Sequence, residues 1–424
     1  MTFSTAVSGI NAANADLGVI SNNIANASTT GFKASRAEFA DVYATSLLGA
    51  GTNAVGLGTE LVSVTQQFSQ GNIEFTNNSL DLAISGSGFF QLSDQGALQY
   101  TRAGAFQLDR EGFVVSNQNL RLQAFQVDTN GDVTGELGDL RISTSLVDPS
   151  ATNNIELTSN LDSRDENPGP GFAASGPYDI FATPSTSPNP LDFNATTSTT
   201  IFDSLGNSHT LALYYVKTTT PNQWDVFPLI DGVSQNGGTP TTLTFTSNGQ
   251  FDPSSPQTVA ITGYAPLDST GAPTGASLQD FNIDVGPTTQ FGTPFAVSSI
   301  VNDGFAAGQL RSVEIDDSGI AFARFTNGQS RALGQIAIAG FNNQNGLQPV
   351  GDTTFVETFQ SGSPNVTEPG TSGLGLIQSA ALEDSNVEIT EQLVDLIIAQ
   401  RNFQANAQVI QTADATTQTV INLR

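Results

Sequence analysis

Both ends of the chain carry a seven-residue repeat of apolar positions. The N-terminal repeat consists of Phe3, Ile10, Leu17 and Ile24, followed three places later by Ala6, Ala13, Ile20 and Ala27. Two apolar positions per heptad are typical of a helix whose seam packs on a partner helix. We therefore expect a helix over residues 1–24.

The C-terminal repeat has the same period. It consists of Ile389, Leu396, Phe403 and Ile410, flanked by Leu393, Ala407, Ala413 and Val420. Ser385 and Glu388 have the spacing of a capping box, which predicts that the helix starts at Ser385 and runs to about Leu423. Matching periods predict that the two terminal helices pair as a coiled-coil-like domain, although each stripe could instead pack on the rest of the chain.

The outer faces of these helices carry few charges, and Asp16 is the only charged residue among the first 32. Such faces favour contact with neighbouring copies, and isolated helices of this composition are marginal in water. We therefore expect both ends to be disordered in the monomer and to fold on polymerising. The predicted subunit-interface residues are Phe3, Ile10, Leu17, Ile24, Leu393, Leu396, Phe403 and Ile410.

The long region between the ends has the pattern of β-strands. Leu80, Leu82 and Ile84 alternate with polar residues before a Gly-rich turn, and residues 210–216 and 241–246 form further strand-like runs between turns. Residues 1–148 contain no proline, whereas all but three of the 19 prolines lie in residues 149–294. The proline boundary predicts a separate β domain in the middle of the chain.

The composition of the chain argues against nucleic-acid binding and against most kinds of catalysis. The chain has 424 residues, 40 acidic against 13 basic side chains and a net charge of -27, so a nucleic-acid partner is not expected. It has no cysteine, two lysines and one histidine, which excludes thiol chemistry and leaves few proton-transfer groups. We expect no enzyme activity, cofactor or metal, and no membrane insertion, because no stretch is apolar enough to span a bilayer.

Three groups of residues invite a chemical interpretation. The segment 128–132 resembles part of a calcium loop, but Val133 stands where an EF-hand requires glycine, so a turn is expected. Asp203, Ser204 and His209 supply the residue types of a catalytic triad without an oxyanion motif. Two of the 40 carboxylates could form the catalytic acid pair of a glycosidase. A surface adhesin that does not polymerise is a further alternative for the function of the chain.

Several long segments resemble the bacterial flagellar rod and hook proteins. The segment 21–33 resembles their N-terminal signature and includes Asn23, Asn26, Gly31 and Phe32. Segments 71–90 and 100–106 are similar to the blocks that follow. Segments 382–387 and 393–406 resemble the C-terminal helix region and include Gln400, Arg401 and Asn406. The large centre, with segment 199–224, resembles the inserted outer domain of the hook members, whereas rod members have a shorter centre.

The resemblance implies a nested architecture, mainly β with terminal helices, in which discontinuous β domains lie outside an inner helical domain. The expected division is an inner helical domain (1–24 and 386–424), a connecting segment (25–72 and 377–385), a discontinuous β domain (73–147 and 296–376) and an inserted outer β domain (148–295).

The resemblance also implies a function: a structural subunit of the flagellar hook, a flexible helical tube that acts as the universal joint between rod and filament. The implied partners are further copies of the chain, the distal rod protein, the hook cap protein, the hook–filament junction protein and the flagellar type III export apparatus. The implied location is the hook on the extracellular surface, reached without a cleaved signal peptide. A distal rod protein is the alternative within the family.

Overall fold

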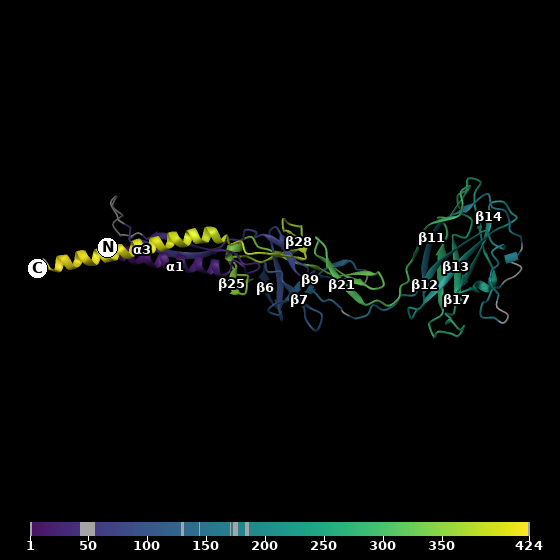
Figure 1. The fold of residues 1–424 in the computed structure, drawn as a ribbon, viewed down its shortest axis with the longest axis horizontal. Helices are drawn as coiled ribbons and strands as arrows, with labels where there is room; N and C mark the ends of the chain where they lie inside the picture. Colours follow the sequence, from purple (N-terminus) through teal and green to yellow (C-terminus); the bar gives the residue numbers. More distant parts are fainter. Residues whose placement is uncertain are drawn as a thin grey trace. The chain divides into compact units, whose positions relative to one another are not determined.

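The computed structural model describes residues 2–42, 56–128, 131–143, 145–169, 171–172, 177–182 and 186–422. The chain is mainly β, with the helices α1 (Thr2–Ala25) and α3 (Ile389–Asn422) at its ends. The two helices pack along each other, as Figure 1 shows. The predicted fold class and helix pairing are therefore confirmed. No helix in the described part of the chain is long and apolar enough to cross a membrane.

The chain folds as two compact units. Unit 1 comprises residues 1–144, 311–324 and 330–424, and unit 2 comprises residues 145–310 and 325–329. Unit 2 is thus an insertion into unit 1 along the sequence. The finer predicted division into helical, connecting and outer parts stays a prediction, and residues 43–55 of the connecting segment lie outside the described residues.

The main sheet of unit 1 is built mostly from antiparallel neighbours. Its central path consists of β21 (Leu310–Ile315), β22 (Ile320–Phe325), β23 (Ser330–Ile336), β9 (Arg121–Val127), β5 (Phe89–Asp94), β6 (Ala97–Thr101), β26 (Thr354–Val356) and β25 (Gln348–Gly351). The strands that join it from the side are β7 (Phe106–Leu108), β8 (Val114–Ser116), β10 (Val133–Asp139), β24 (Ile338–Gly340) and β27 (Asn365–Thr367).

Three two-stranded ribbons complete unit 1. They are β1 (Ser35–Val42) with β2 (Gly58–Gln66), β3 (Ile73–Phe75) with β29 (Ala381–Glu383), and β4 (Leu82–Ser85) with β28 (Leu376–Ser379). The last two pair strands from opposite ends of the sequence. They bring the segment before α3 alongside the segment that follows α1 and β2.

The core of unit 1 includes a cluster of aromatic rings. Phe89 contacts Phe341 and Phe355 edge to face, with ring centroids 5.9 and 6.0 Å apart, and Tyr100 contacts Phe341 at 4.8 Å. Edge-to-face pairs of this kind add to the stabilisation that burial provides. The cluster joins β5 and β6 to the segments after β24 and in β26, so it ties the early and late parts of unit 1 together.

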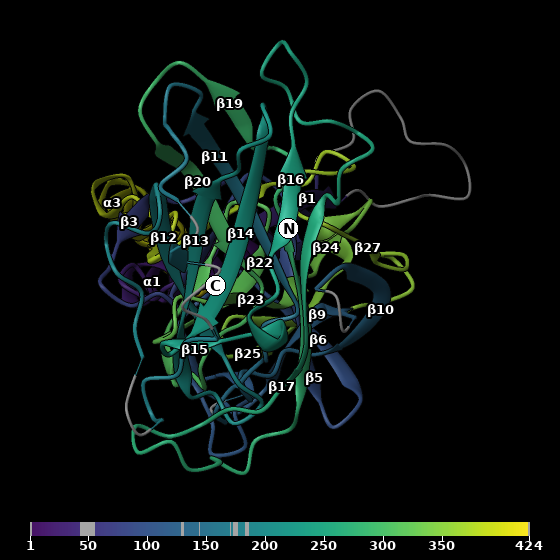
Figure 2. The ribbon, with the colours of Figure 1, turned by 90° about the vertical axis from the view of Figure 1, so that its right-hand side faces the viewer.

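Unit 2 consists of two sheets that share one core, and Figure 2 labels strands of both sheets. One contains β17 (Thr258–Tyr264), β18 (Gln279–Asp284), β11 (Asn154–Asp162), β19 (Thr289–Phe291) and β20 (Ala296–Asn302). The other contains β12 (Ala195–Phe202), β13 (Ser208–Lys217), β14 (Gln223–Ile230), β15 (Val233–Ser234) and β16 (Thr241–Thr244). Alternate residues of β11 and β13 are buried, as expected for strands with one face on a core. The strands predicted at residues 210–216 and 241–246 are confirmed.

Two local predictions about the helices are wrong. Helix α3 begins at Ile389 rather than at Ser385, because the backbone carbonyl of Glu388 already accepts the hydrogen bond from Gln392 N. The Ser385 hydroxyl accepts a hydrogen bond from Val387 N instead of capping the helix. At the other end, α1 stops at Ala25, so Ala27 lies in the turn beyond the helix and cannot extend the seam.

Candidate assembly interface

Helix α1 packs on α3, β2 and β1, and its most deeply buried apolar side chains are small or aliphatic. Ala6, Ala13 and Ile20 are buried, at 3%, 6% and 5% exposure. The other predicted series is more open: Ile10, Leu17 and Ile24 are half-buried and Phe3 is 57% exposed. One of the two residue series predicted for the seam of α1 is therefore buried within the chain, and the other remains partly uncovered.

On α3 the pattern differs from the predicted one. Leu396, Phe403 and Ile410 are half-buried and Ala399 is 1% exposed, whereas Leu393 is 46% exposed. Polar residues take the other seam positions, because Asn406 packs on Gly9 and Gln392 bonds to Asn23. A Cβ atom on Gly9 would lie 2.7 Å from the Asn406 amide, so a larger residue at position 9 would displace this amide. The apolar heptad alone could not reveal these polar members.

Two of the family-signature residues fix the end of α1. Asn23 is 2% exposed, and its amide donates to Ser35 O at 2.8 Å and to the Gln392 side chain at 2.9 Å. Its oxygen accepts from Ser35 N at 2.9 Å. The Asn26 amide donates to Asn22 O at 3.0 Å, satisfying a carbonyl at the helix end. Asn23 thus joins α1, β1 and α3 through one side chain.

Gly31 and Phe32 form the turn that follows. Gly31 has a φ of 70°, and a Cβ atom there would lie 2.4 Å from Ala103 N. Its own N–H donates to Glu383 O at 2.8 Å. Phe32 is half-buried and lines a cleft of about 930 Å³, together with Asn26, Thr101 and Phe355. Most of the lining is uncharged, and the cleft offers no cluster of catalytic groups.

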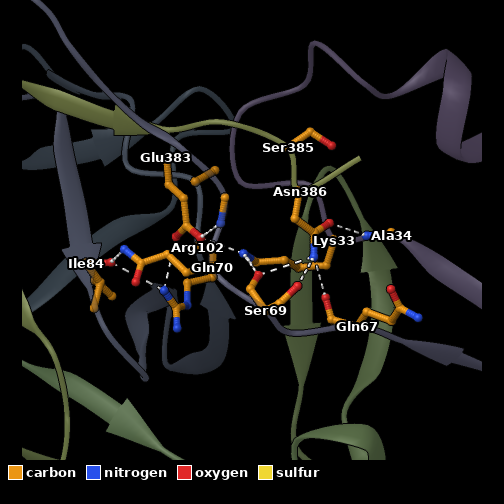
Figure 3. Close-up of polar contacts among 12 residues, drawn as sticks. Lys33, Ala34, Gln67, Ser69, Gln70, Ile84, Arg102, Glu383, Ser385 and Asn386 are labelled. Atoms are coloured by element: carbon orange, nitrogen blue, oxygen red, sulfur yellow. Dashed lines mark hydrogen bonds and ion pairs between the residues drawn. The ribbon is translucent and has the colours of Figure 1, made fainter. Parts of the chain in front are cut away.

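Next to this turn lies a buried charged cluster, which we call the charge hub: Lys33, Arg102 and Glu383 (Figure 3). The Glu383 carboxylate is 2.6 Å from Lys33 Nζ and 3.0 Å from an Arg102 guanidinium nitrogen. It also accepts from Gly71 N at 2.9 Å. The side chains are 0%, 3% and 0% exposed for Lys33, Arg102 and Glu383. Burial lowers the pKa of the Lys33 ammonium and of the Arg102 guanidinium, while the hydrogen bond and the charge of Glu383 oppose both shifts.

Backbone carbonyls accept hydrogen bonds from two further donors of the hub, whereas Arg102 Nε is buried without a hydrogen-bond partner among the described residues. Lys33 Nζ donates to Ser69 O at 2.8 Å, and Arg102 donates to Gly86 O at 2.7 Å. Beside them, the Asn386 oxygen accepts from Ala34 N at 2.7 Å while its amide donates to Gln67 O at 2.8 Å (Figure 3). The hub therefore holds the segments that leave α1, leave β2 and enter α3 at one place.

Composition and spacing did not point to the hub. Lys33, Arg102 and Glu383 belong to three different segments of the family resemblance, 21–33, 100–106 and 382–387. Lys33 and Arg102 are single charges in otherwise neutral segments, whereas Asp384 follows Glu383 directly, and nothing in the sequence pairs the three hub residues across such separations. In contrast, Gln400 and Arg401 lie exposed on α3, away from the hub and from the seam.

In unit 2, the residues with triad-like chemistry are not arranged for catalysis. The His209 imidazole lies 2.6 Å from an Asp231 carboxylate oxygen and 3.5 Å from an Asp203 oxygen. Ser204 instead accepts a hydrogen bond from Ser277 N. The hydrogen bond to Asp231 raises the pKa of His209, against the effect of burial. His209 is a buried residue that joins two carboxylates at strand ends, and the described residues hold no cluster of His, Cys, Asp or Glu suited to a metal.

Sequence comparison matches nearly the whole chain to one group of proteins. Residues 3–33 match the family described as Flagella basal body rod protein, and residues 83–160 match the Flagellar hook protein FlgE/F/G D1 domain. Residues 160–305 match the Flagellar basal body protein FlaE D2 domain, and residues 378–423 match the Flagellar basal body rod FlgEFG protein C-terminal family.

Individual relatives agree with these matches. The chain is 37% identical to the flagellar hook protein FlgE of Escherichia coli (strain K12), over 100% of both chains. It is 34% identical to FlgE of Borreliella burgdorferi, over 99% of this chain and 98% of that protein. The crystal structure of Helicobacter pylori flagellar hook protein FlgE2 has a similar fold, with a TM-score of 0.52 over 73% of this chain and 100% of that one, at 14% identity. The chain therefore belongs to the flagellar hook protein family.

Proposed function

We propose that this chain is the structural subunit of the bacterial flagellar hook and that its copies polymerise into a flexible helical tube. The tube acts as the universal joint between the basal-body rod and the filament. The observation that carries the proposal is that α1 and α3 pair within one chain and still leave large apolar side chains exposed. Phe3 is 57% exposed, and Leu393 is 46% exposed on the side of α3 away from α1. Exposed apolar groups on an otherwise polar protein are typical of an interaction surface.

The proposed subunit interface comprises both series of helix residues. Phe3, Ile10, Leu17, Ile24, Leu393, Leu396, Phe403 and Ile410 all retain exposed surface in the single chain. The half-buried members serve the helix pair and a neighbouring copy together, because each side chain has one covered and one open side. The charge hub fixes the direction in which the helix pair leaves the sheets of unit 1, which keeps identical copies in identical contacts.

We extend the proposal to the partners and the location. In addition to copies of itself, the chain would contact the distal rod protein, the hook cap protein and the hook–filament junction protein. It would reach the extracellular surface through the flagellar type III export apparatus without cleavage of a signal peptide. A chain without cysteine suits this route, because no disulfide prevents passage in an unfolded state. No catalytic role is part of the proposal.

Immunogold electron microscopy of purified flagellar basal bodies tests the location. An antibody against residues 150–290 should label the short curved segment between basal body and filament. Label confined to the rod would indicate a distal rod protein instead. Absence of label from the flagellum would favour a surface adhesin that does not polymerise.

Substitution in the helix pair tests the interface. Leu17→Glu and Phe403→Glu should each abolish tube formation, because burying an unpaired charge costs about 3–5 kcal/mol. Unit 2 should stay folded in both variants, as judged by its thermal transition. The matched control is Leu278→Glu, at a residue of unit 2 that is 71% exposed and should tolerate the charge. Normal tubes from both helix variants would refute the assignment of the interface.

A further inference from the structure

The outward side of α3 carries a compact apolar surface in its first three turns, which we call the α3 patch. It consists of Leu393, Val394, Ile397 and Ile398. Each of these side chains is between 46% and 53% exposed. Helical spacing places Gln392, which bonds to Asn23 of α1, and the buried Ala399 on the opposite side of α3, so the patch points away from the helix pair. Within the described part of the chain, α1 is the element that packs on α3.

A second uncovered apolar surface lies on the ribbon formed by β1 and β2. Phe39 pairs with Leu61 across this ribbon, and both are about 40% exposed, at 39% and 40%. The register shifts between Glu38 and Phe39, so Val62 has no partner across the ribbon and is 66% exposed. A bulge of this kind changes the direction in which the side chain of the unpaired residue, here Val62, points. The ribbon packs on α1, where the Ser8 hydroxyl accepts from Thr59 N at 3.3 Å, and no further strand joins it among the described residues.

The two surfaces carry opposite charges at the end of the α3 patch where Arg401 lies, whereas Glu391 and Asp395 make the start of α3 negative. Arg401 is exposed one turn beyond Ile397, and no described carboxylate lies within ion-pairing distance of it. It is the only basic residue in the described part of α3. On the ribbon, Glu60 and Asp41 are both exposed. Each lies opposite an uncharged residue of the facing strand, and neither has a described cationic partner. A free cation beside one apolar surface thus matches free anions beside the other.

We propose that the α3 patch of one copy docks on the β1–β2 ribbon of a second copy, with Arg401 of the first facing Glu60 of the second. This inference rests on the proposed polymerisation and names the contact that carries it. A contact between two different surfaces is heterologous, so each added copy leaves one ribbon and one patch free for the next. A patch-to-patch contact would be isologous instead, would close at a dimer, and would place Arg401 near its own counterpart.

Cysteine pairing tests the contact directly, since the natural chain has no cysteine to confuse the result. Tubes assembled from the full chain carrying both Val62→Cys and Ile397→Cys should give a ladder of oligomers on mild oxidation, in denaturing gels without reductant. Either single variant should remain monomeric. Val62→Cys with Val350→Cys, at a residue of unit 1 that is 50% exposed, is the matched control and should not form the ladder.

Each alternative result overturns the inference. Dimers from Ile397→Cys alone would show that two α3 patches meet, and a ladder as strong from the control pair would show that the crosslinks report chance collisions. Tubes in which the double variant stays monomeric would place the patch and the ribbon apart. A wild-type chain that forms no tubes refutes the proposed function itself, which is a different result from tubes without crosslinks.

Charge exchange is the second measurement and needs no crosslink. Arg401→Glu should reduce the number of hooks per cell at least about tenfold, because it places like charges opposite each other. The double variant Arg401→Glu with Glu60→Arg should restore hooks and swimming. Arg331→Glu makes the same charge change at an exposed arginine of β23 and should leave hook number unchanged. Unchanged hook number in Arg401→Glu, or loss without rescue by Glu60→Arg, would overturn the pairing.

Discussion

Replacement of Glu383 by glutamine should destabilise unit 1 strongly while leaving unit 2 intact. The substitution keeps the shape of the side chain but removes the negative charge that Lys33 and Arg102 share. The distances from the carboxylate are 2.6 Å to Lys33 Nζ, 3.0 Å to Arg102 and 2.9 Å to Gly71 N. Since all three side chains of the hub are almost fully buried, water cannot replace the lost partner.

The expected loss follows from this geometry. Removing one partner of a buried ion pair costs about 3–5 kcal/mol, and here two cations would be left facing each other. A unit of this size loses roughly 2–4 °C of melting temperature per kcal/mol, so its thermal transition should fall by about 6–20 °C. Lys33→Met should cost less than Glu383→Gln, because it leaves a neutral pair of Arg102 with Glu383.

Differential scanning calorimetry of the full chain measures the effect, since the transition of unit 2 serves as an internal reference. Glu314→Gln is the matched control. Glu314 pairs with Arg324 at 2.6 Å, but both side chains are more than half exposed, so the loss should stay below about 1 kcal/mol. The reasoning is refuted if Glu383→Gln costs no more than Glu314→Gln, or if Lys33→Met is the more harmful of the two hub variants.

Three further outcomes are expected. The hydrogen bond to Asp231 raises the pKa of His209, so His209 contributes stability that is complete below pH 6.5 and is lost as pH rises through its folded pKa. At Asp203, burial opposes the shift, but hydrogen bonds lower the pKa of the carboxyl below its usual value. Asp203 therefore contributes stability that is complete above pH 3.8 and is lost as pH falls through its folded pKa. Unit 2 should therefore melt highest between these values in a pH series, and His209→Gln should abolish the alkaline decline. Gly31→Ala should cost roughly 1–3 kcal/mol more than Gly373→Ala in chemical denaturation, because the two glycines have a similar positive φ but only Gly31 has backbone atoms in the way. Limited proteolysis of dilute monomer should trim both ends before the β units, and protected ends would contradict folding on assembly.

The terminal helices could be predicted from the sequence because their signal is local. A seven-residue apolar period over almost four heptads specifies a helix with an apolar stripe along one face. The predicted helix at residues 1–24 agrees with α1 (Thr2–Ala25). The start of α3 was harder to predict. The Ser385 hydroxyl accepts a hydrogen bond from Val387 N, two residues on, and the helix begins at Ile389. Short polar side chains choose among several nearby backbone donors, and sequence does not rank them.

The polar half of the helix seam could not be predicted. Gln392 and Asn406 occupy seam positions because Asn23 and Gly9 lie opposite them, and those neighbours come from the other end of the chain. An amide is acceptable there only when its partner is present. Leu393 looked equally suitable by hydrophobicity, but the rotation of α3 against α1 turns it outward.

The sequence by itself determined the class of the molecule: helical ends, a β centre and an acidic composition. These follow from periodicity and composition, which each residue carries with it wherever the chain folds. Tertiary structure alone decided which charges meet. Lys33, Arg102 and Glu383 come together because β29 pairs with β3 and β28 pairs with β4, bringing the C-terminal segment beside the N-terminal one. A buried charge is stable only beside its partner, and that partner is specified by topology rather than by spacing along the chain.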